Sequence, residues 1–343
     1  MMLKAPVSAI LGLLLTCFWT PAALGEDLMP KITRWYDNKK AAVSLRFDDS
    51  LESHVRTVIP LLDSFGIRAT FMVNPGRASF KRHENFWTRD AIAAGHNLGN
   101  HTMNHRGART LAEAEYEIGE TARIIREFYP DRSPLMVFAS GGGEKWGGRK
   151  WSEADDQFRD LPASYDLIDL YDGTHSYVSG RSDQTAQTLY NHVEKAMEEG
   201  LHQAFLFHQV GSPRLIDRGR KFLTGRADVI SVAEYRAFLE LLSERREELW
   251  IAPLIEIIKY ERERLASSIV GVEVSQNKIV FRLKVETDSS FYDHPLSCLI
   301  ENAPVLERVT QDGRQIDHRV GDSGLWLNLA PESSEVTVFF QED

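Results

Sequence analysis

Cysteine is nearly absent from this chain of 343 residues, which contains only Cys17 and Cys298. Cys17 falls in an N-terminal segment with the layout of a secretory signal: a lysine, an apolar run and small residues that end at Gly25. We expect cleavage after Gly25, which leaves Cys298 alone and excludes an intrachain disulfide. The stability of the exported protein must then come from packing.

Positive charge and long apolar runs are also scarce. The chain has 40 Lys and Arg against 50 Asp and Glu, a net charge of −10, which becomes −11 when Lys4 leaves with the signal. An acidic surface argues against nucleic acid or an anionic membrane as a partner. No later segment approaches the run of about 20 apolar residues that a transmembrane helix needs. We therefore expect an exported protein, periplasmic or extracellular, with no transmembrane segment after cleavage; its oligomeric state is unknown.

Segments typical of strands and helices alternate from about Ile32 to Leu265. Short apolar runs predict buried strands, and capping boxes at Thr110 and Ser231 predict helix starts. This alternation predicts an α/β fold whose parallel sheet is curled into a barrel or doubly wound. From about Ala266 onward, alternating apolar residues predict a small antiparallel β domain. The predicted parts are a signal peptide (1–25), an α/β unit (26–265) and a β domain (266–343).

Residues that can bind a metal or carry a proton follow three of the predicted strands. Asp48 and Asp49 end the first, His101 and His105 follow another, and His208 follows a third. The carboxyl ends of parallel strands meet at one edge of a sheet, so these groups should converge. Imidazoles spaced i, i+4 fall on one face of a helical turn and can bind one cation. A carboxylate would complete a three-ligand site with an open position for water, which indicates hydrolase chemistry.

In these motifs the chain resembles the polysaccharide deacetylases with the NodB-homology domain, carbohydrate esterase family four. Arg46-Phe47-Asp48-Asp49 stands in the place of the family's Thr-Phe-Asp-Asp motif. The His-Ser/Thr-x-x-His motif is matched by residues 101–105, and the Leu-x-His strand end by residues 206–208. The resemblance spans about residues 40–260. It implies a distorted (β/α) barrel, a divalent metal, often zinc, and hydrolysis of N- or O-acetyl groups on a poly- or oligosaccharide.

The resemblance also implies a role for each of these residues. Asp49, His101 and His105 would hold the metal. Asp48 would be the general base that takes a proton from water, and His208 the general acid that protonates the leaving group. A carboxylate and a histidine titrating near neutrality suit these two tasks.

The chain departs from the family at two further motifs. Where the third motif has Arg-x-Pro-Tyr, residues 138–143 read Phe-Ala-Ser-Gly-Gly-Gly. Backbone N–H groups of Gly141 and Gly142 can still face an oxyanion. The missing arginine has one candidate substitute, Arg46, whose side chain points to the same side of its strand as Asp48; the alternative is an arginine at the rim of the site. For the fourth motif, which tunes the acid histidine, Asp169 is preferred over Asp166 and Asp172. Trp146, beside the glycine turn, is a candidate for stacking on a sugar ring.

Three functions remain open at this point. The leading prediction is an exported, metal-dependent carbohydrate deacetylase. The altered third motif and the β tail also allow a carbohydrate-binding protein on a degenerate deacetylase scaffold. A third hypothesis keeps the metal but changes the bond, as in a cyclic-imide or amide hydrolase on a related barrel.

Overall fold

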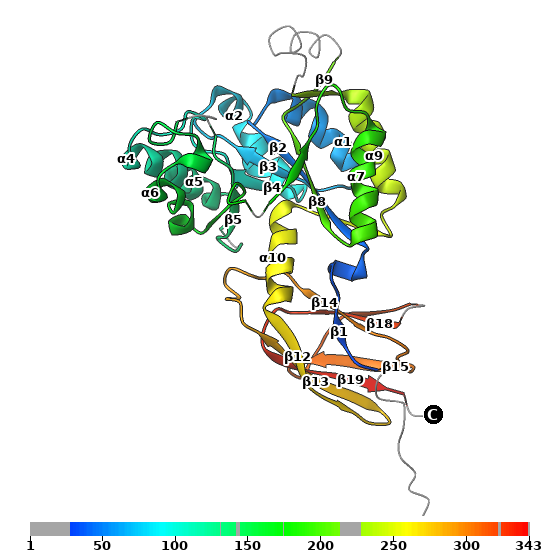
Figure 1. Ribbon diagram of the computed structural model, residues 1–343. Helices are drawn as coiled ribbons and strands as arrows, with labels where there is room; N and C mark the ends of the chain where they lie inside the picture. Colours follow the sequence, from blue (N-terminus) through cyan, green and yellow to red (C-terminus); the bar gives the residue numbers. More distant parts are fainter. Residues whose placement is uncertain are drawn as a thin grey trace, which may run out of the picture.

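The computed structural model describes residues 28–130, 132–141, 145–173, 175–212, 228–321 and 324–341. The expected signal peptide and Gly142 lie outside the described residues. An α/β unit and a smaller β unit are joined by the helix α10 (Leu254–Leu265) (Figure 1). Among the described residues, no helix has both the length and the apolar character required to cross a bilayer.

The α/β unit is built on one parallel sheet of seven strands in the order β6-β5-β4-β3-β2-β8-β7. A further strand, β11 (Leu249–Ile251), pairs in parallel with the first part of β2. The sheet curls, and among the described residues no pairing joins its end strands, so it forms a half-barrel. The predicted distorted barrel is thus confirmed. The seven strands are β2 (Ala41–Asp48), β3 (Thr70–Val73), β4 (Asn97–Asn100), β5 (Met136–Phe138), β6 (Leu167–Asp169), β7 (Tyr177–Ser179) and β8 (His202–Phe207).

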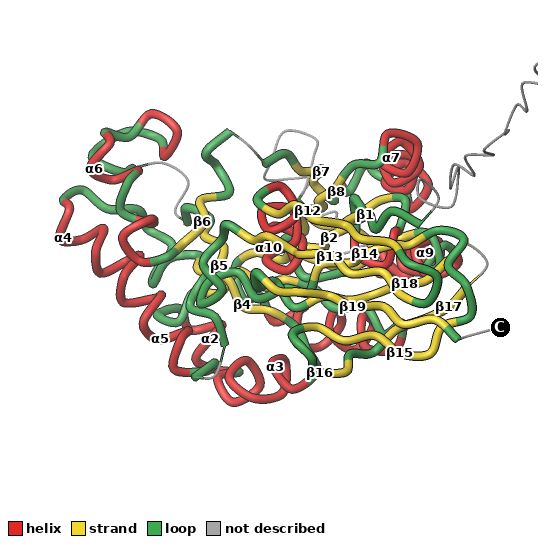
Figure 2. The backbone as a smooth tube through the Cα atoms, turned by 90° about the horizontal axis from the view of Figure 1, so that it is seen from below, coloured by secondary structure: helices red, strands yellow, loops and turns green. Residues whose placement is uncertain are grey.

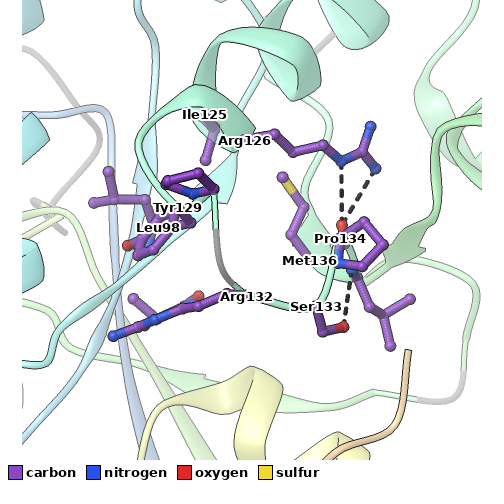
Figure 3. Close-up of a pocket in the computed structure, with 11 residues that line it drawn as sticks. Leu98, Ile125, Arg126, Tyr129, Arg132, Ser133, Pro134 and Met136 are labelled. Atoms are coloured by element: carbon purple, nitrogen blue, oxygen red, sulfur yellow. Dashed lines mark hydrogen bonds between the residues drawn. The ribbon is translucent and has the colours of Figure 1, made fainter. Parts of the chain in front are cut away.

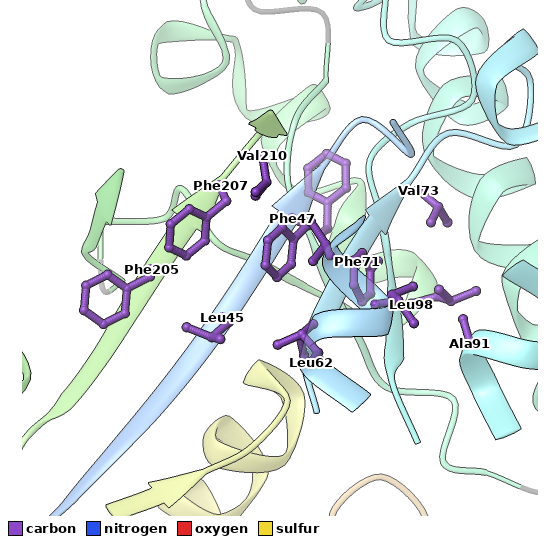
Figure 4. Packing of buried hydrophobic residues seen from close by; sticks show 14 of the residues in the cluster. Leu45, Phe47, Leu62, Phe71, Val73, Ala91, Leu98, Phe205, Phe207 and Val210 are labelled. Carbon is purple, nitrogen blue, oxygen red and sulfur yellow. The ribbon is translucent and has the colours of Figure 1, made fainter. Parts of the chain in front are cut away.

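The central strand β2 is buried along its whole length, and its two faces differ. Val43, Leu45 and Phe47 face the helices, whereas the intervening Arg46 and Asp48 take the opposite face because side chains alternate along a strand. The Phe47 ring stacks between Phe71 and Phe207 of the two neighbouring strands, at centroid distances of 5.1 and 5.3 Å (Figure 4). This apolar layer fixes the register of the strands that end in polar residues.

Helices cover the outer face of the sheet, and two of the predicted caps are present. The Thr110 hydroxyl accepts a hydrogen bond from the Glu113 N–H, and the Ser231 hydroxyl accepts one from the Glu234 N–H. The Glu234 carboxylate, however, accepts from the N–H of Ala186 and so caps the neighbouring helix. The helical segments are η2 (His54–Val58), α1 (Ile59–Ser64), α2 (Ala78–Arg82), η3 (Phe86–Asp90), α3 (Ala91–Ala93), α4 (Leu111–Ala114), η4 (Glu115–Glu120), α5 (Thr121–Glu127), η5 (Trp151–Glu153), α6 (Asp156–Arg159), η6 (Pro162–Tyr165), α7 (Ala186–Glu199) and α9 (Val232–Glu244).

The helix α10 belongs to the cores of both units. Leu254, Ile255 and Ile258 pack with Met72 and other residues of the inner face of the half-barrel. Ile257 and Tyr260, on another face of the helix, lie in the core of the β unit. The helix therefore fixes one unit against the other through apolar contacts.

The β unit consists of two antiparallel sheets, whose strands are yellow in Figure 2. The two sheets share an apolar core. Its first strand comes from the start of the described chain: Ile32 of β1 pairs with Cys298 of β14. The residues before η1 (Tyr36–Asn38) thus lie with the β unit, although the sequence pattern grouped them with the α/β unit. One sheet contains β1 (Lys31–Ile32), β14 (Leu296–Ile300), β18 (Gly324–Leu329) and β17 (His318–Gly321); the other contains β12 (Ser267–Val274), β13 (Lys278–Val285), β19 (Ser334–Phe340), β15 (Leu306–Gln311) and β16 (Arg314–Gln315).

A small cavity of about 190 Å³ lies at the amino-terminal edge of the parallel sheet (Figure 3). Its lining includes Asn97 and Met136, the first residues of β4 and β5. Arg126 partly closes it by donating hydrogen bonds to the carbonyl of Pro134. This cavity lies at the opposite end of those strands from the predicted catalytic residues.

Candidate active site

The carboxyl edge of the parallel sheet carries the chemistry-bearing residues. Asp48 is the last residue of β2, His101 follows β4, and His208 follows β8. Parallel pairing of β2 with β3 and β8, and of β3 with β4, brings these three strand ends to the same edge. The convergence predicted from the sequence is present.

Asp49, His101 and His105 form a compact cluster. The Asp49 Oδ1 atom lies 3.1 Å from His105 Nε2 and 3.6 Å from His101 Nε2. The donor atoms of the three residues all lie within 4.8 Å of one another. One aspartate oxygen and two imidazole nitrogens are a donor set that suits a divalent cation such as zinc.

The two histidines meet in a loop, which differs from the predicted helical turn. Thr102 and His105 have positive φ angles of 68° and 59°, and Asp49 has a φ of 84°. Such angles are uncommon for residues other than glycine and cost free energy, which surrounding contacts must offset. The buried Asn74 supplies some of these contacts, because its side-chain amide donates to the carbonyls of His101 and Thr102.

The imidazole of His101 is oriented for metal binding. Its Nδ1–H donates to the carbonyl of Ala139 at 3.0 Å, which leaves the lone pair of Nε2 directed into the cluster. That Nε2 atom is buried and has no hydrogen-bond partner among the described residues. Burial lowers the pKa of His101 despite the nearby Asp48 and Asp49, and so favours the neutral form that binds metals. A buried Nε2 atom without a hydrogen-bond partner therefore fits the role of a metal ligand.

Arg46 and Asp48 form a buried, two-point ion pair. Arg46 Nε and Nη2 lie 2.7 and 2.6 Å from the two carboxylate oxygens of Asp48, and both side chains are at most 3% exposed. Burial alone would raise the pKa of Asp48, but the guanidinium outweighs it and lowers that pKa to about 2. Arg46 Nη2 also donates to the Tyr171 hydroxyl at 3.2 Å. The structure therefore places Arg46 inside the site and not at its rim.

The backbone of His208 is held by a hydrogen bond from His54. His54 is fully buried; its Nδ1 accepts from the Leu51 N–H at 3.2 Å, and its Nε2 donates to the His208 carbonyl at 2.5 Å. Burial lowers the pKa of His54 to about 4, so it stays neutral with the proton on Nε2. The His208 imidazole is one of the charges that lower the pKa of Asp48.

Arg77 is a site residue that the sequence reading missed. Its Nη1 donates to Asp49 Oδ1 at 3.1 Å from the loop that precedes α2. The only sequence signal was a basic residue shortly after the end of a predicted strand. Such a signal is too common to single out one arginine.

Gly141 lies against the loop that carries the two histidines. A Cβ atom at this position would come within 2.5 Å of the His101 carbonyl and 2.9 Å of His105 Cδ2. Only glycine permits this approach of two backbones. Gly141 thus lies beside the candidate metal ligands, and the oxyanion role of its N–H stays a prediction; its predicted neighbour Gly142 lies outside the described residues.

Two predicted residues contact Trp151, and one of them differs from expectation. Trp146 is 1% exposed and packs edge-on against Trp151 at 4.9 Å, so no face of its ring is available to a sugar. Asp169 accepts from Trp151 Nε1 at 2.7 Å and from the Tyr171 N–H at 3.0 Å. Neither contact joins Asp169 to His208, and its role in tuning that histidine stays a prediction.

Together, the half-barrel and its aspartate and two histidines define an α/β protein with a candidate metal centre at the carboxyl edge of its sheet. Residues 36–154 match the family model described as polysaccharide deacetylase. This part of the chain, which includes Asp48, Asp49, His101, His105 and Gly141, is similar to that family, of NodB homology, as its motifs predicted. His208 lies beyond the matched residues.

One curated relative matches most of the chain but is far larger. Gellan lyase of a Bacillus species is 22% identical over 330 residues, which are 90% of this chain and 13% of that protein. The chain thus spans about an eighth of the length of this relative.

Several solved structures also match. Peptidoglycan deacetylase PdaC from Bacillus subtilis is 15% identical, with 68% of this chain and 96% of that chain covered and a TM-score of 0.41. The polysaccharide deacetylase Bc1974 from Bacillus cereus is 18% identical, with 62% and 91% covered and a TM-score of 0.39. A CE4 family pseudoenzyme from Bacillus anthracis, BA3943, is 14% identical, with 66% and 68% covered and a TM-score of 0.41.

Proposed function

We propose that this protein is an exported, metal-dependent carbohydrate deacetylase that hydrolyses N- or O-acetyl groups on a poly- or oligosaccharide. The observation that carries the proposal is the orphaned Nε2 atom of His101, buried beside Asp49 and His105 and adjacent to the Arg46–Asp48 pair. His83 and His175 also have a buried Nε2 atom without a partner, but the Nε2 atom of His101 lies within 4.8 Å of two other candidate ligand atoms.

In this proposal Asp49, His101 and His105 hold a divalent cation, with zinc as the expected ion. When bound, such an ion supplies a Lewis acid that polarises an acetyl carbonyl and lowers the pKa of water. The carbonyl of Ala139 keeps His101 in the tautomer that can bind it. Gly141, by its contact with the same loop, keeps the two imidazoles close together.

The proton transfers are assigned to Asp48 and His208. Arg46 keeps Asp48 ionised, and the carboxylate accepts the proton of the attacking water. The same ion pair limits the strength of Asp48 as a base, because its pKa is about 2. His208 then protonates the leaving amine or alkoxide, from a position fixed by the hydrogen bond of His54 to its carbonyl. The layout of residues 1–25 supports export to the periplasm or the extracellular space.

A non-catalytic carbohydrate-binding function is the second candidate, and the altered third motif favours it. Residue 139 is alanine, so that position offers no guanidinium to a base. Against this candidate stands the buried Arg46–Asp48 pair, since burying two charges is costly and serves no evident purpose in a binding protein.

Acetate release from N-acetylated chito-oligosaccharides and O-acetylated xylo-oligosaccharides tests the proposal. The chain without residues 1–25 is stripped with a chelator and assayed before and after addition of zinc; acetate should appear only after loading. Saccharide binding without acetate would support the binding protein, and turnover of a cyclic imide without acetate from sugars would support the imide hydrolase.

Replacement of the proposed base separates catalysis from metal binding. Asp48→Asn should keep its metal by elemental analysis but lose roughly 10²- to 10⁴-fold in rate, the usual contribution of general acid–base catalysis. Asp90→Asn, which removes the same charge from an exposed position on η3, is the matched control and should be unaffected. Near-full activity of Asp48→Asn would refute the assignment of roles.

A further inference from the structure

Three segments around the candidate metal centre are basic, although the protein as a whole is acidic. The segments 77–82, 105–109 and 145–150 contain eight Lys and Arg and no Asp or Glu, whereas the whole chain has a net charge of −10. A local charge opposite in sign to the net charge raises the concentration of oppositely charged ligands at that place. The eight cations are Arg77, Lys81, Arg82, Arg106, Arg109, Lys145, Arg149 and Lys150.

Backbone hydrogen bonds join these three segments into one surface. The Gly76 N–H donates to the Met103 carbonyl at 2.9 Å, which places the first segment beside the loop of His105. The Ala108 N–H donates to the Lys145 carbonyl at 3.0 Å, and the Gly147 N–H donates back to the Ala108 carbonyl at 2.8 Å. The third segment therefore continues the same surface. We call these three segments the basic surface.

A polar cavity of about 380 Å³ connects the basic surface with the candidate metal centre. Arg77, His105 and Arg106 line it together with Gly76, Ala78 and Asn104. His105 is one of the three candidate ligands, so an anion in this cavity would lie next to the reacting group. The nearest acid on η4, Glu117, is 5% exposed, and its two carboxylate oxygens accept hydrogen bonds from the backbone and side-chain N–H groups of Asn104.

Most of the cations on the basic surface form no ion pair with an acid among the described residues. Arg77 pairs with Asp49, Arg82 with Glu52 and Arg149 with Asp155. The other five make no ion pair within the part of the chain that the structure describes. They are Lys81, Arg106, Arg109, Lys145 and Lys150.

We propose that the basic surface binds an acidic polysaccharide, and that the substrate is an acetylated glycan with repeated negative charges, such as uronate carboxylates. The assignment to a substrate rests on the proposed deacetylase function. Cations spread over three segments match charges repeated along a glycan chain better than they match one small anion. The cavity beside His105 would hold the acidic sugar next to the acetylated one, with Arg106 as its principal cation.

Binding of oligogalacturonate, which carries no acetyl group, tests the proposal without requiring turnover. Titration calorimetry on the zinc-loaded protein should show binding that weakens as sodium chloride rises from about 0.05 to 0.3 M, because salt screens exposed charges. The double variant Arg106→Gln/Lys145→Gln should bind roughly tenfold more weakly, as expected for two exposed charge contacts. A double variant with the same charge change on β13, Lys278→Gln/Arg282→Gln, should bind like the unmodified protein.

Three results would overturn the proposal. In the first, oligogalacturonate binds no more tightly than a neutral chito-oligosaccharide. In the second, the β13 variant weakens binding as much as the Arg106/Lys145 variant does. In the third, an oligonucleotide of equal charge competes with oligogalacturonate on equal terms, which would indicate a general affinity for polyanions.

Acetate assays distinguish a failure of this proposal from a failure of the proposed function. If no glycan yields acetate but oligogalacturonate still binds through Arg106 and Lys145, the deacetylase function fails and the basic surface stands. If acetylated xylo-oligosaccharides are deacetylated at least as well as acetylated oligogalacturonates, the function stands and the acidic substrate is refuted. Metal content measured for each variant excludes loss of the ion as the cause.

Discussion

Glu263 is an acid buried where α10 meets the β unit, and its replacement gives a prediction with a defined pH dependence. The side chain is fully buried; Oε1 accepts from the His294 N–H at 2.9 Å, while Oε2 has no hydrogen-bond partner among the described residues. Burial raises the pKa of Glu263, the hydrogen bond from the His294 N–H lowers it, the nearby Asp293 raises it, and Lys259, which pairs with Asp293 at 2.6 Å, lowers it; the net pKa is about 7. Burial also lowers the pKa of His294, so this neighbour offers no positive charge in compensation.

The raised pKa means that Glu263 destabilises the folded protein at alkaline pH. Between the ordinary value of 4.5 and about 7, the folded state binds a proton that the unfolded chain has released, so stability falls as pH rises through this window. The shift of 7 − 4.5 = 2.5 units corresponds to about 3 kcal/mol at about 1.4 kcal/mol per unit. Glu263→Gln is neutral at every pH and keeps an oxygen for the His294 N–H. It should resemble the unmodified protein at pH 5 and be up to about 3 kcal/mol more stable at pH 8.

Urea unfolding followed by tryptophan fluorescence at pH 5, 6, 7 and 8 measures this difference, because Trp35 and Trp250 lie in the same core as α10. Glu261→Gln removes the same charge two residues away from a less buried position on α10 and is the matched control. A stability difference that is constant from pH 5 to pH 8, or one that Glu261→Gln reproduces, would refute the reasoning.

Three further replacements test the candidate site. Arg46→Met leaves the buried Asp48 carboxylate without its partner and should cost about 3–5 kcal/mol of stability in urea unfolding, as well as activity; a loss below 1 kcal/mol would mean that the pair is not formed. His101→Ala should lose the metal by elemental analysis, whereas retention of a full equivalent would remove His101 from the ligand set. Gly141→Ala should weaken zinc affinity measured by competition with a chelator, because its Cβ would press on the loop of His101 and His105; unchanged affinity would show that the loop can move aside.

The sequence was sufficient to locate the strand ends, because buried parallel strands are apolar runs and their carboxyl ends share one edge. Asp48, His101 and His208 therefore followed from pattern alone. The shape of the loop from His101 to His105 did not follow. It depends on positive φ angles at Thr102 and His105, residues that carry no local signal for that conformation.

Tertiary contacts decided what the remaining site residues do. Trp146 lies beside a glycine turn in the sequence, but its backbone pairs with Ala108 and its ring packs against Trp151 in the core. The strand β1 is only two residues long, too short to show an alternation of apolar and polar residues. It forms by pairing with β14, which lies far away in the sequence. Such long-range pairings leave no trace in a local window of sequence.

The ion pair of Arg46 with Asp48 gives Asp48 an arginine partner although the third motif lacks its arginine. In the family that the chain resembles, an arginine of that motif orients the base, and here residue 139 is alanine. Side chains two residues apart on a strand point to the same side, so Arg46 reaches both oxygens of Asp48 from within β2. Ala139 still acts on the site through its carbonyl, which orients His101. In the proposed mechanism the arginine that orients the base therefore lies on β2 and not in the third motif, and residue 139 contributes through its backbone carbonyl.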